Sequence, residues 1–140
     1  MKQSYESYLI PGAIAAAVLF AVYRIFGKSK EVETFDKDIL KAKQTQKPTF
    51  SESVYNTLAN RLYAAGTTNF GTDEKAIYSV FKLLKNDLDF LLLQKSFGSK
   101  RNEFSLQFSD MGGYLQSELN AEEIDMVNKI LISKGIKGRI

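Results

Sequence analysis

A long uncharged run near the start of the chain is the feature that most constrains what it can fold into. The run reads SYLIPGAIAAAVLFAVY, residues 7–23. With the Ile-Phe pair just beyond it, the apolar segment spans about 18–20 residues, close to the roughly 20 that cross a hydrocarbon core as a helix. A cleaved signal peptide would show a small-x-small cleavage site, and a buried soluble helix would show a polar face. We therefore expect an N-terminal transmembrane anchor, residues 1–27.

The residues in and beside this run predict how the anchor sits. Tyr8 and Tyr23 stand at its two ends, where interfacial aromatic residues belong, and Arg24 can extend its charge out of the last turn. Three basic residues follow the run and one precedes it, which places the C-terminal part on the cytoplasmic side. Gly12 and Ala16 belong to a face of small residues at four-residue spacing. Such a face allows homo-oligomers in the bilayer, although alanine is also simply common in short spans.

Composition narrows the function classes. The 140 residues include no cysteine and no histidine, which removes thiolate metal sites, the usual general base and the Ser-His triad. Residues 1–48 carry eight Lys/Arg and five Asp/Glu, whereas residues 49–140 carry eleven of each. The second part is therefore not a basic nucleic-acid module, and we expect a non-enzymatic protein with no specific nucleic-acid partner.

Helical patterns continue after the anchor. Residues 28–48 form a charged linker that we expect to be partly helical, with a break from Gln44 to Pro48. Residues 49–140 predict an all-α domain of four main helices and one short helix. Expected helix starts are a Thr49-x-x-Glu52 capping box, Thr72, Asn86 and Asn120. The expected apolar stripes are Phe50, Val54, Leu58 and Leu62; Ile77, Val80, Phe81 and Leu84; Leu88, Leu91, Leu92 and Phe97; and Ile124, Val127, Ile130 and Leu131.

Part of this domain resembles an annexin repeat. The resemblance covers roughly half the chain, and its specific motif is Gly-Thr-Asp-Glu at residues 71–74. It continues through Ala76-Ile77, Phe97-Gly98 and Leu115 to Leu119. The chain's end, from Val127 to Ile140, is also similar to single annexin-like domains encoded by bacteriophages of the Bacteroidota.

The resemblance implies a calcium site. In annexins a Gly-x-Gly-Thr loop offers carbonyl oxygens to calcium, and an acidic residue further on completes the site. The matching residues are Gly71, Thr72 and Glu118. Asn69 replaces the first glycine, and Asp110 matches the usual spacing where Glu118 matches the local sequence. Calcium needs six to eight oxygen ligands, so these departures favour the alternative that Thr72 simply starts a helix.

The sequence predicts a docking function. We expect a membrane protein whose helical domain binds a protein partner, with Phe104, Phe108, Lys100 and Arg101 as a docking patch if the two aromatic residues are exposed and not packed on the core. The phage resemblance implies a virion structural protein that lies between a membrane and a capsid and links the two. The alternatives are a phage lysis protein that oligomerises in the host membrane and a calcium-dependent phospholipid-binding module.

Overall fold

The structure is a computed structural model that describes residues 30–67, 71–102 and 107–140, with side chains from residue 33 onward. The chain divides into two compact units, Met1–Lys37 and Asp38–Ile140. In the described ranges no helix is long and apolar enough to cross a membrane. The anchor residues predicted from the sequence all lie outside the described residues, namely Tyr8, Gly12, Ala16, Tyr23 and Arg24.

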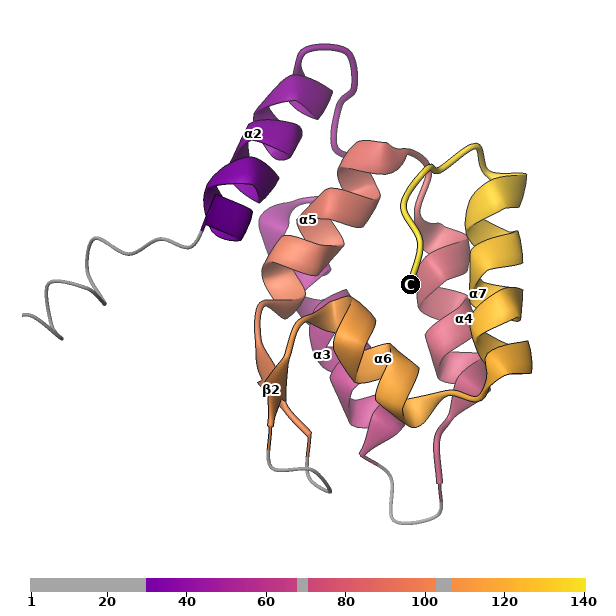
Figure 1. The fold of residues 1–140 in the computed structure, drawn as a ribbon. Coiled ribbons are helices and arrows are strands. Elements are labelled where there is room, and N and C mark those ends of the chain that lie inside the picture. The colour runs from indigo at the N-terminus through magenta and orange to yellow at the C-terminus, as the bar shows by residue number, and fades with distance from the viewer. Residues whose placement is uncertain (1–29, 68–70, 103–106) are drawn as a thin grey trace, which may run out of the picture. The chain divides into compact units, whose positions relative to one another are not determined.

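The described part of the chain is mostly helical (Figure 1), which confirms the predicted class of fold for it. The predicted helix in the first part of the linker is also observed. A two-stranded antiparallel hairpin, which the sequence did not predict, lies among the helices. In chain order the elements are α2 (Lys30–Lys43), α3 (Glu52–Gly66), α4 (Glu74–Leu83), α5 (Asp87–Phe97), β1 (Lys100–Arg101), β2 (Phe108–Ser109), α6 (Met111–Glu118) and α7 (Ala121–Ser133).

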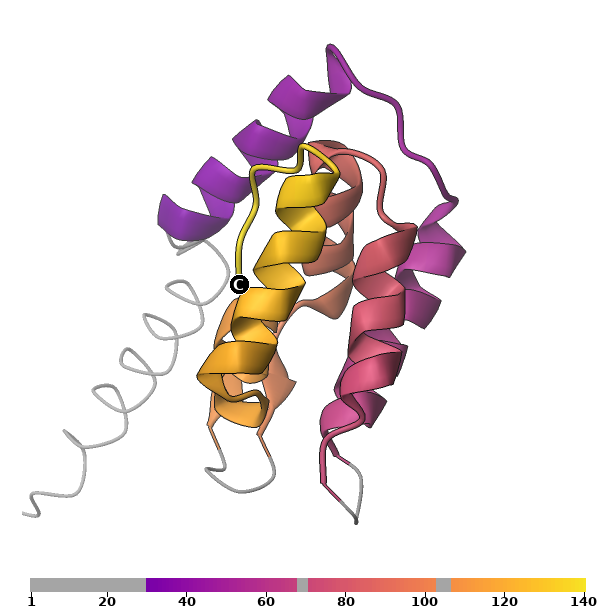
Figure 2. The same ribbon diagram turned by 90° about the vertical axis from the view of Figure 1, so that its right-hand side faces the viewer.

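The helices of the second unit surround one hydrophobic core. Helix α3 packs against α4 and α5, and α4 packs against α7, so these helices lie alongside one another (Figure 2). Tyr55 near the start of α3 bonds to Asp89 in the first turn of α5, and the ring of Tyr63 meets that of Phe97 at the other end. Helices α3 and α5 therefore run in the same direction.

Two of the predicted apolar stripes match the core closely. Ile77, Val80, Phe81 and Leu84 are all completely buried. In α7, Val127 and Leu131 are buried while Ile124 and Ile130 are partly buried against them. These two helices pack on each other, so a single apolar stripe at helical spacing was enough to predict each buried face.

The predicted stripes of α3 and α5 match the core in part, since Leu58, Leu62, Leu88 and Phe97 are buried as predicted. In α3 the buried face is Tyr55, Leu58, Ala59, Leu62 and Ala65, whereas Val54 is 37% exposed and Phe50 lies ahead of the helix. In α5, Phe90 and Leu93 are buried and the predicted Leu91 and Leu92 are only half-buried. The completely buried Asp89 joins the two helices here by accepting from the Tyr55 hydroxyl.

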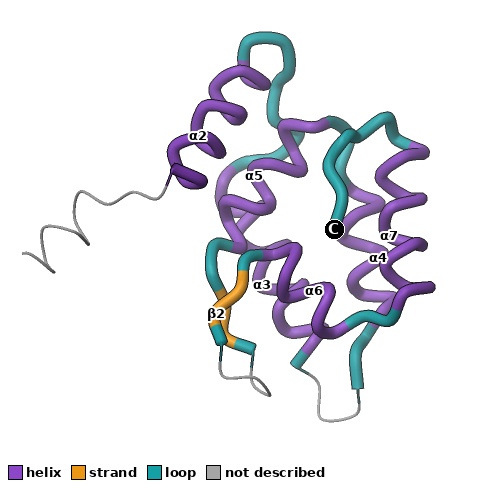
Figure 3. Tube along the Cα trace, in the orientation of Figure 1, coloured by secondary structure: helices purple, strands orange, loops and turns teal. Residues whose placement is uncertain are grey.

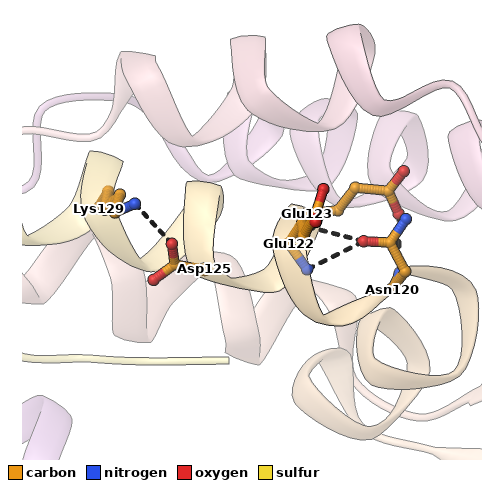
Figure 4. Close-up of polar contacts among 5 residues, drawn as sticks. All are labelled: Asn120, Glu122, Glu123, Asp125 and Lys129. Carbon is orange, nitrogen blue, oxygen red and sulfur yellow. Dashed lines mark hydrogen bonds and ion pairs between the residues drawn. The ribbon is translucent and has the colours of Figure 1, made fainter.

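Helix α7 begins with the capping box that the sequence predicted (Figure 4). The Asn120 side-chain oxygen accepts from the backbone N–H groups of Glu122 and Glu123, both at 3.0 Å. The Glu123 carboxylate accepts from the Asn120 N–H at 2.8 Å, so three N–H groups at the start of the helix are satisfied by the capping box. One turn further on, Lys129 and Asp125 form an exposed ion pair at 2.6 Å.

The last residues of the chain return to the core. Gly135, with a φ of +71°, ends α7 as predicted, and Ile136 is buried beyond it. Gly138 lies so close to the ring of Phe90 that a Cβ there would be 2.3 Å from it. Ile140 exchanges two backbone hydrogen bonds with the Asn128 side chain. Figure 3 shows this segment as a loop that ends among the helices.

The segment that leads into α3 is held on the first turn of α5. The Leu88 N–H donates to the Gln46 side chain at 2.9 Å, and the Asn86 side chain donates to the Lys47 carbonyl at 3.1 Å. The second unit begins at Asp38 and includes the buried Ile39. Its first residues thus lie ahead of Thr49, where the sequence placed the start of the domain.

Thr49 does not form the predicted capping box. Its hydroxyl donates to Asp89 at 2.6 Å and its N–H donates to the same carboxylate at 2.9 Å. Helix α3 starts instead at Glu52, with Ser51 as an N-cap whose side chain makes no capping bond. The prediction was wrong because a fully buried carboxylate offers the Thr49 hydroxyl a charge-assisted bond, which is stronger than an exposed cap.

Asp89 is completely buried and is satisfied by hydrogen bonds from four donors. Besides the two from Thr49, the Tyr55 hydroxyl donates at 2.6 Å and the Lys85 N–H at 2.8 Å. Burial alone raises the pKa of Asp89, but the bonds from Thr49, Tyr55 and Lys85 outweigh burial and hold it below its usual value. Burial, together with the bond to Asp89, raises the pKa of Tyr55 to about 12.

Candidate functional site

The residues of the predicted calcium loop form the start of α4. Asp73, not Thr72, is the N-cap, since its carboxylate accepts from the Ala76 N–H at 2.9 Å. The Thr72 hydroxyl donates to the backbone carbonyl of Glu118 at 3.1 Å. The prediction of Thr72 as N-cap was therefore wrong, because its hydroxyl is drawn to the carbonyl at the end of α6. Gly71 precedes it with a φ of +101°, a conformation that favours glycine.

The structure brings Thr72 and Glu118 together, but the carboxylate of Glu118 faces a different partner. Its Oε1 accepts from the Asn102 side-chain amide at 2.8 Å. Asp110, the other acidic candidate, caps α6 by accepting from the Gly113 N–H at 2.8 Å. Among the described residues no three acidic side chains gather to hold a metal ion. Calcium binding by Gly71, Thr72 and Glu118 stays a prediction.

Asn102 connects the predicted calcium loop, through Glu118, to the hairpin. It is only 4% exposed, and its amide also donates to the Ser117 hydroxyl at 2.7 Å. Its N–H donates to the Gln107 carbonyl at 2.8 Å, which closes the hairpin beyond the paired strands. A continuous chain of bonds therefore runs from Thr72 through Glu118 and Asn102 to the hairpin. The hairpin, the end of α6 and the start of α4 lie at the same end of the domain in Figure 1.

The inner face of the hairpin is attached to α3. The Tyr63 hydroxyl donates to the Arg101 carbonyl at 3.0 Å. The ammonium of Lys100 lies 5.7 Å from the centre of the Tyr63 ring, within cation–π range. Tyr63 itself packs against the rings of Phe97 and Tyr114, so the strand that carries Lys100 and Arg101 is fixed to the aromatic part of the core.

The outer face of the hairpin carries an aromatic residue beside a cation. Arg101 pairs directly with Phe108 across the strands, so the two side chains leave the same face. Arg101 is exposed, and Phe108 is 72% exposed, the highest value among the exposed large apolar residues in the described part of the chain. The predicted docking residues thus divide: Lys100 faces inward, Arg101 and Phe108 face outward, and Phe104 lies outside the described residues.

The residues that hold the hairpin were missed by the sequence reasoning. Asn102 and Tyr63 carry no local pattern that marks them, because their partners are distant in sequence: the Tyr63 bond to Arg101 spans 38 positions. Asn102 was a polar residue in the least regular part of the chain. The available signal was the basic pair at positions 100 and 101, which drew attention to this loop but not to its support.

Comparison of the chain with models of protein families, with curated proteins and with solved structures finds no match. The annexin resemblance stays a prediction.

Proposed function

We propose that this protein is a non-enzymatic, single-pass membrane protein whose helical domain docks a protein partner through the β1–β2 hairpin. The observation that carries the proposal is the 72% exposure of Phe108 beside Arg101 on a hairpin whose other face is bonded to the core. Aromatic residues and arginine are among the residues most often found to dominate the binding energy of protein interfaces.

The support beneath the hairpin favours a binding role. A two-stranded hairpin is marginally stable by itself in water. Here the buried Asn102 amide and the Tyr63 hydroxyl hold it in place. A side chain presented on a fixed backbone loses less conformational freedom when a partner binds, which raises affinity. The arrangement thus suits Phe108 as an anchor that enters an apolar pocket, with Arg101 meeting an acidic group at its rim.

The predicted anchor supplies the membrane side of the function. Residues 7–23 would hold the chain in a bilayer, and the linker would present the domain to the partner. The resemblance to phage-encoded domains makes a virion the natural setting, with the protein linking a membrane to the protein shell. A capsid or other virion protein would then be the partner.

Photo-crosslinking tests the docking proposal. Phe108 is replaced by benzoylphenylalanine in the full chain, expressed in cells that make the intact assembly. We expect one discrete crosslinked protein after illumination. The matched control carries the same group at Leu83, an exposed apolar residue on α4, and should not give that product. The same product from both positions, or crosslinks to lipid alone from Phe108, would contradict docking through the hairpin.

The membrane part is tested separately on the same cells. The protein should stay with membranes after alkaline carbonate extraction and should keep Met1. A mature N-terminus beyond Tyr23 would show that the apolar run is a signal peptide and would remove the anchor from the proposal.

A further inference from the structure

A cleft opens on the second unit, beside the segment that leads into α3. Its volume is about 480 Å³, within the range of about 300–1,000 Å³ typical of ligand sites. Pro48, Phe50 and Leu92 supply its apolar surface, and Lys43, Lys95 and Glu52 supply its charges. The end of α2, the start of α3 and the second half of α5 all contribute to it.

Tyr55 and Phe50, which line the cleft, are held in place by contacts within the domain. Tyr55 is buried, and its hydroxyl is held by Asp89. The ring of Phe50 meets the Tyr55 ring edge-on at 5.8 Å, and the Phe50 N–H donates to the Tyr55 hydroxyl at 3.4 Å. Phe50 and Leu92 remain half-buried, so each keeps apolar surface that an incoming side chain can cover. The site is therefore preformed.

The charges of the cleft select the ligand. Lys43 and Lys95 outnumber the single acid, Glu52. Two ammonium groups beside an apolar floor fit a ligand that places a carboxylate next to a hydrophobic side chain. Helix α5, which contributes Leu92, Lys95 and Ser96 to the cleft, leads directly into the hairpin. Lys95 lies in the last turn of α5, and β1 begins at Lys100.

The spacing along α3 connects the cleft with the hairpin. Asn56 lines the cleft and Tyr63 holds the hairpin. The two residues are about two helical turns apart, so they lie on the same side of α3 about 10 Å from each other. An extended peptide covers that distance with about three residues. A peptide segment seated in the cleft can therefore extend along α3 to the level of the hairpin.

We infer that the cleft binds a short, extended, acidic segment of the partner protein. A hydrophobic side chain of the segment covers Phe50 and Leu92, and a neighbouring carboxylate lies beside Lys43 in a lining that is positive overall. The inference rests on the proposed function, because it assigns a second contact to the partner that the hairpin docks.

Peptide selection on the full-length protein tests the inference. The protein is held in neutral detergent micelles and presented to a displayed library of random heptapeptides. We expect the enriched sequences to share an Asp or Glu close to a large apolar residue. The best peptide is then synthesised with a fluorescent label, and its dissociation constant is measured by anisotropy against the variants described next.

Charge reversal in the cleft should weaken the peptide. The double change Lys43→Glu and Lys95→Glu should raise the dissociation constant by about tenfold or more. The control, Lys75→Glu with Lys82→Glu on α4, makes the same change of net charge outside the cleft lining and should change it by about twofold or less. Circular dichroism checks the fold, and the corresponding Lys→Gln variants replace any variant that fails to fold.

Three outcomes would overturn the inference. They are enrichment of basic peptides or of no shared sequence, equal weakening by both double variants, and displacement of the peptide by dihexanoyl phosphatidylglycerol, which would assign the cleft to lipid. If any of these occurs while the crosslink from position 108 persists, the hairpin still docks a partner and only the cleft assignment fails. Loss of the crosslink as well would remove the docking function itself.

Discussion

Two buried polar side chains, Asp89 and Asn102, hold the segments that come before and after α5 in different ways. Asp89, in the first turn, is a carboxylate with no exposure, and it accepts from four donors: the hydroxyl and N–H of Thr49, the Tyr55 hydroxyl and the Lys85 N–H. Asn102, just beyond the last turn, is a neutral amide whose partners Ser117 and Glu118 are in contact with solvent. A buried carboxylate that loses four donors leaves more unsatisfied groups than a buried amide that loses two acceptors. We therefore expect the bonds of Asp89 to contribute more to stability than those of Asn102.

Removing the Asp89 carboxylate should give the largest effect. Asp89→Ala leaves the N–H groups of Thr49 and Lys85 without acceptors and should lower the free energy of unfolding by about 3–5 kcal/mol. Urea denaturation followed by circular dichroism measures it. Asp125→Ala, which removes an exposed helical acid from an ion pair, should cost about 0.5 kcal/mol or less. Similar losses of unfolding free energy from the two variants would show that the hydrogen bonds of Asp89 contribute no more to stability than an exposed ion pair.

Removing the Asn102 amide should give a smaller and more local effect. Asn102→Ala should lower stability by about 1–3 kcal/mol and should release the hairpin before the helices. Amide hydrogen exchange measures this: exchange should accelerate in β1, β2 and at residue 102, with little change in α4 and α7. Acceleration across all helices would mean that the hairpin is part of the core and that the two ends of α5 do not differ.

The dependence of stability on pH should reveal the ionisation of Asp89 and of Tyr55, which is bonded to it. The pKa of Asp89 is lowered in the folded state. The ionised carboxylate therefore contributes its full stabilisation above the pKa of about 4 that it has in the unfolded chain, and this stabilisation is lost as pH falls through the folded pKa. The pKa of Tyr55 is raised to about 12. Its contribution is complete below the unfolded value of about 10 and is lost as pH rises towards 12.

Thermal unfolding across these ranges is the measurement for both groups. Tyr55→Phe should remove the loss of stability between about pH 10 and 12, and Asp89→Asn should flatten the acid limb. If Tyr55→Phe unfolds on the alkaline side in the same way as the unmodified chain, other groups govern that limb.

The smallest effects should come from the start of α4. Asp73→Ala removes the observed N-cap and should cost about 1 kcal/mol. Thr72→Ala removes one bond to the Glu118 carbonyl and should cost about 0.5–1 kcal/mol. Millimolar calcium should not raise the melting temperature. A clear rise that Glu118→Gln abolishes would show that the annexin-like residues bind calcium.

Helix starts could be predicted from the sequence where the bonds are local. Asn86 and Asn120 cap helices through N–H groups two or three residues further on, and both were predicted. Thr49 and Thr72 have the same chemistry, but their hydroxyls bond groups 40 and 46 positions away. A local sequence pattern does not indicate partners so far along the chain. Residues that cap their own helix therefore could not be distinguished from residues that bond distant groups.

The candidate site was less predictable for the same reason. The basic pair and Phe108 were noted from the sequence, but two strands of two residues are too short to show alternation. Which of these side chains faces outward depends on the bonds of Tyr63 and Asn102. Those bonds form only once α3, α5 and α6 have been brought together.

The direction of α5 has a mechanical consequence for a tethered domain. The segment that leads into α3 is bonded to the start of α5 by Gln46, Lys47 and Thr49, and the hairpin follows the last turn. If the domain is tethered as proposed, tension between a bilayer and a docked partner would run along α5 and the parallel α3, and it would load the Gln46 and Lys47 bonds before the Thr49 bonds to Asp89. Helices α4 and α7 would lie outside the loaded path, although they share one core with α3 and α5.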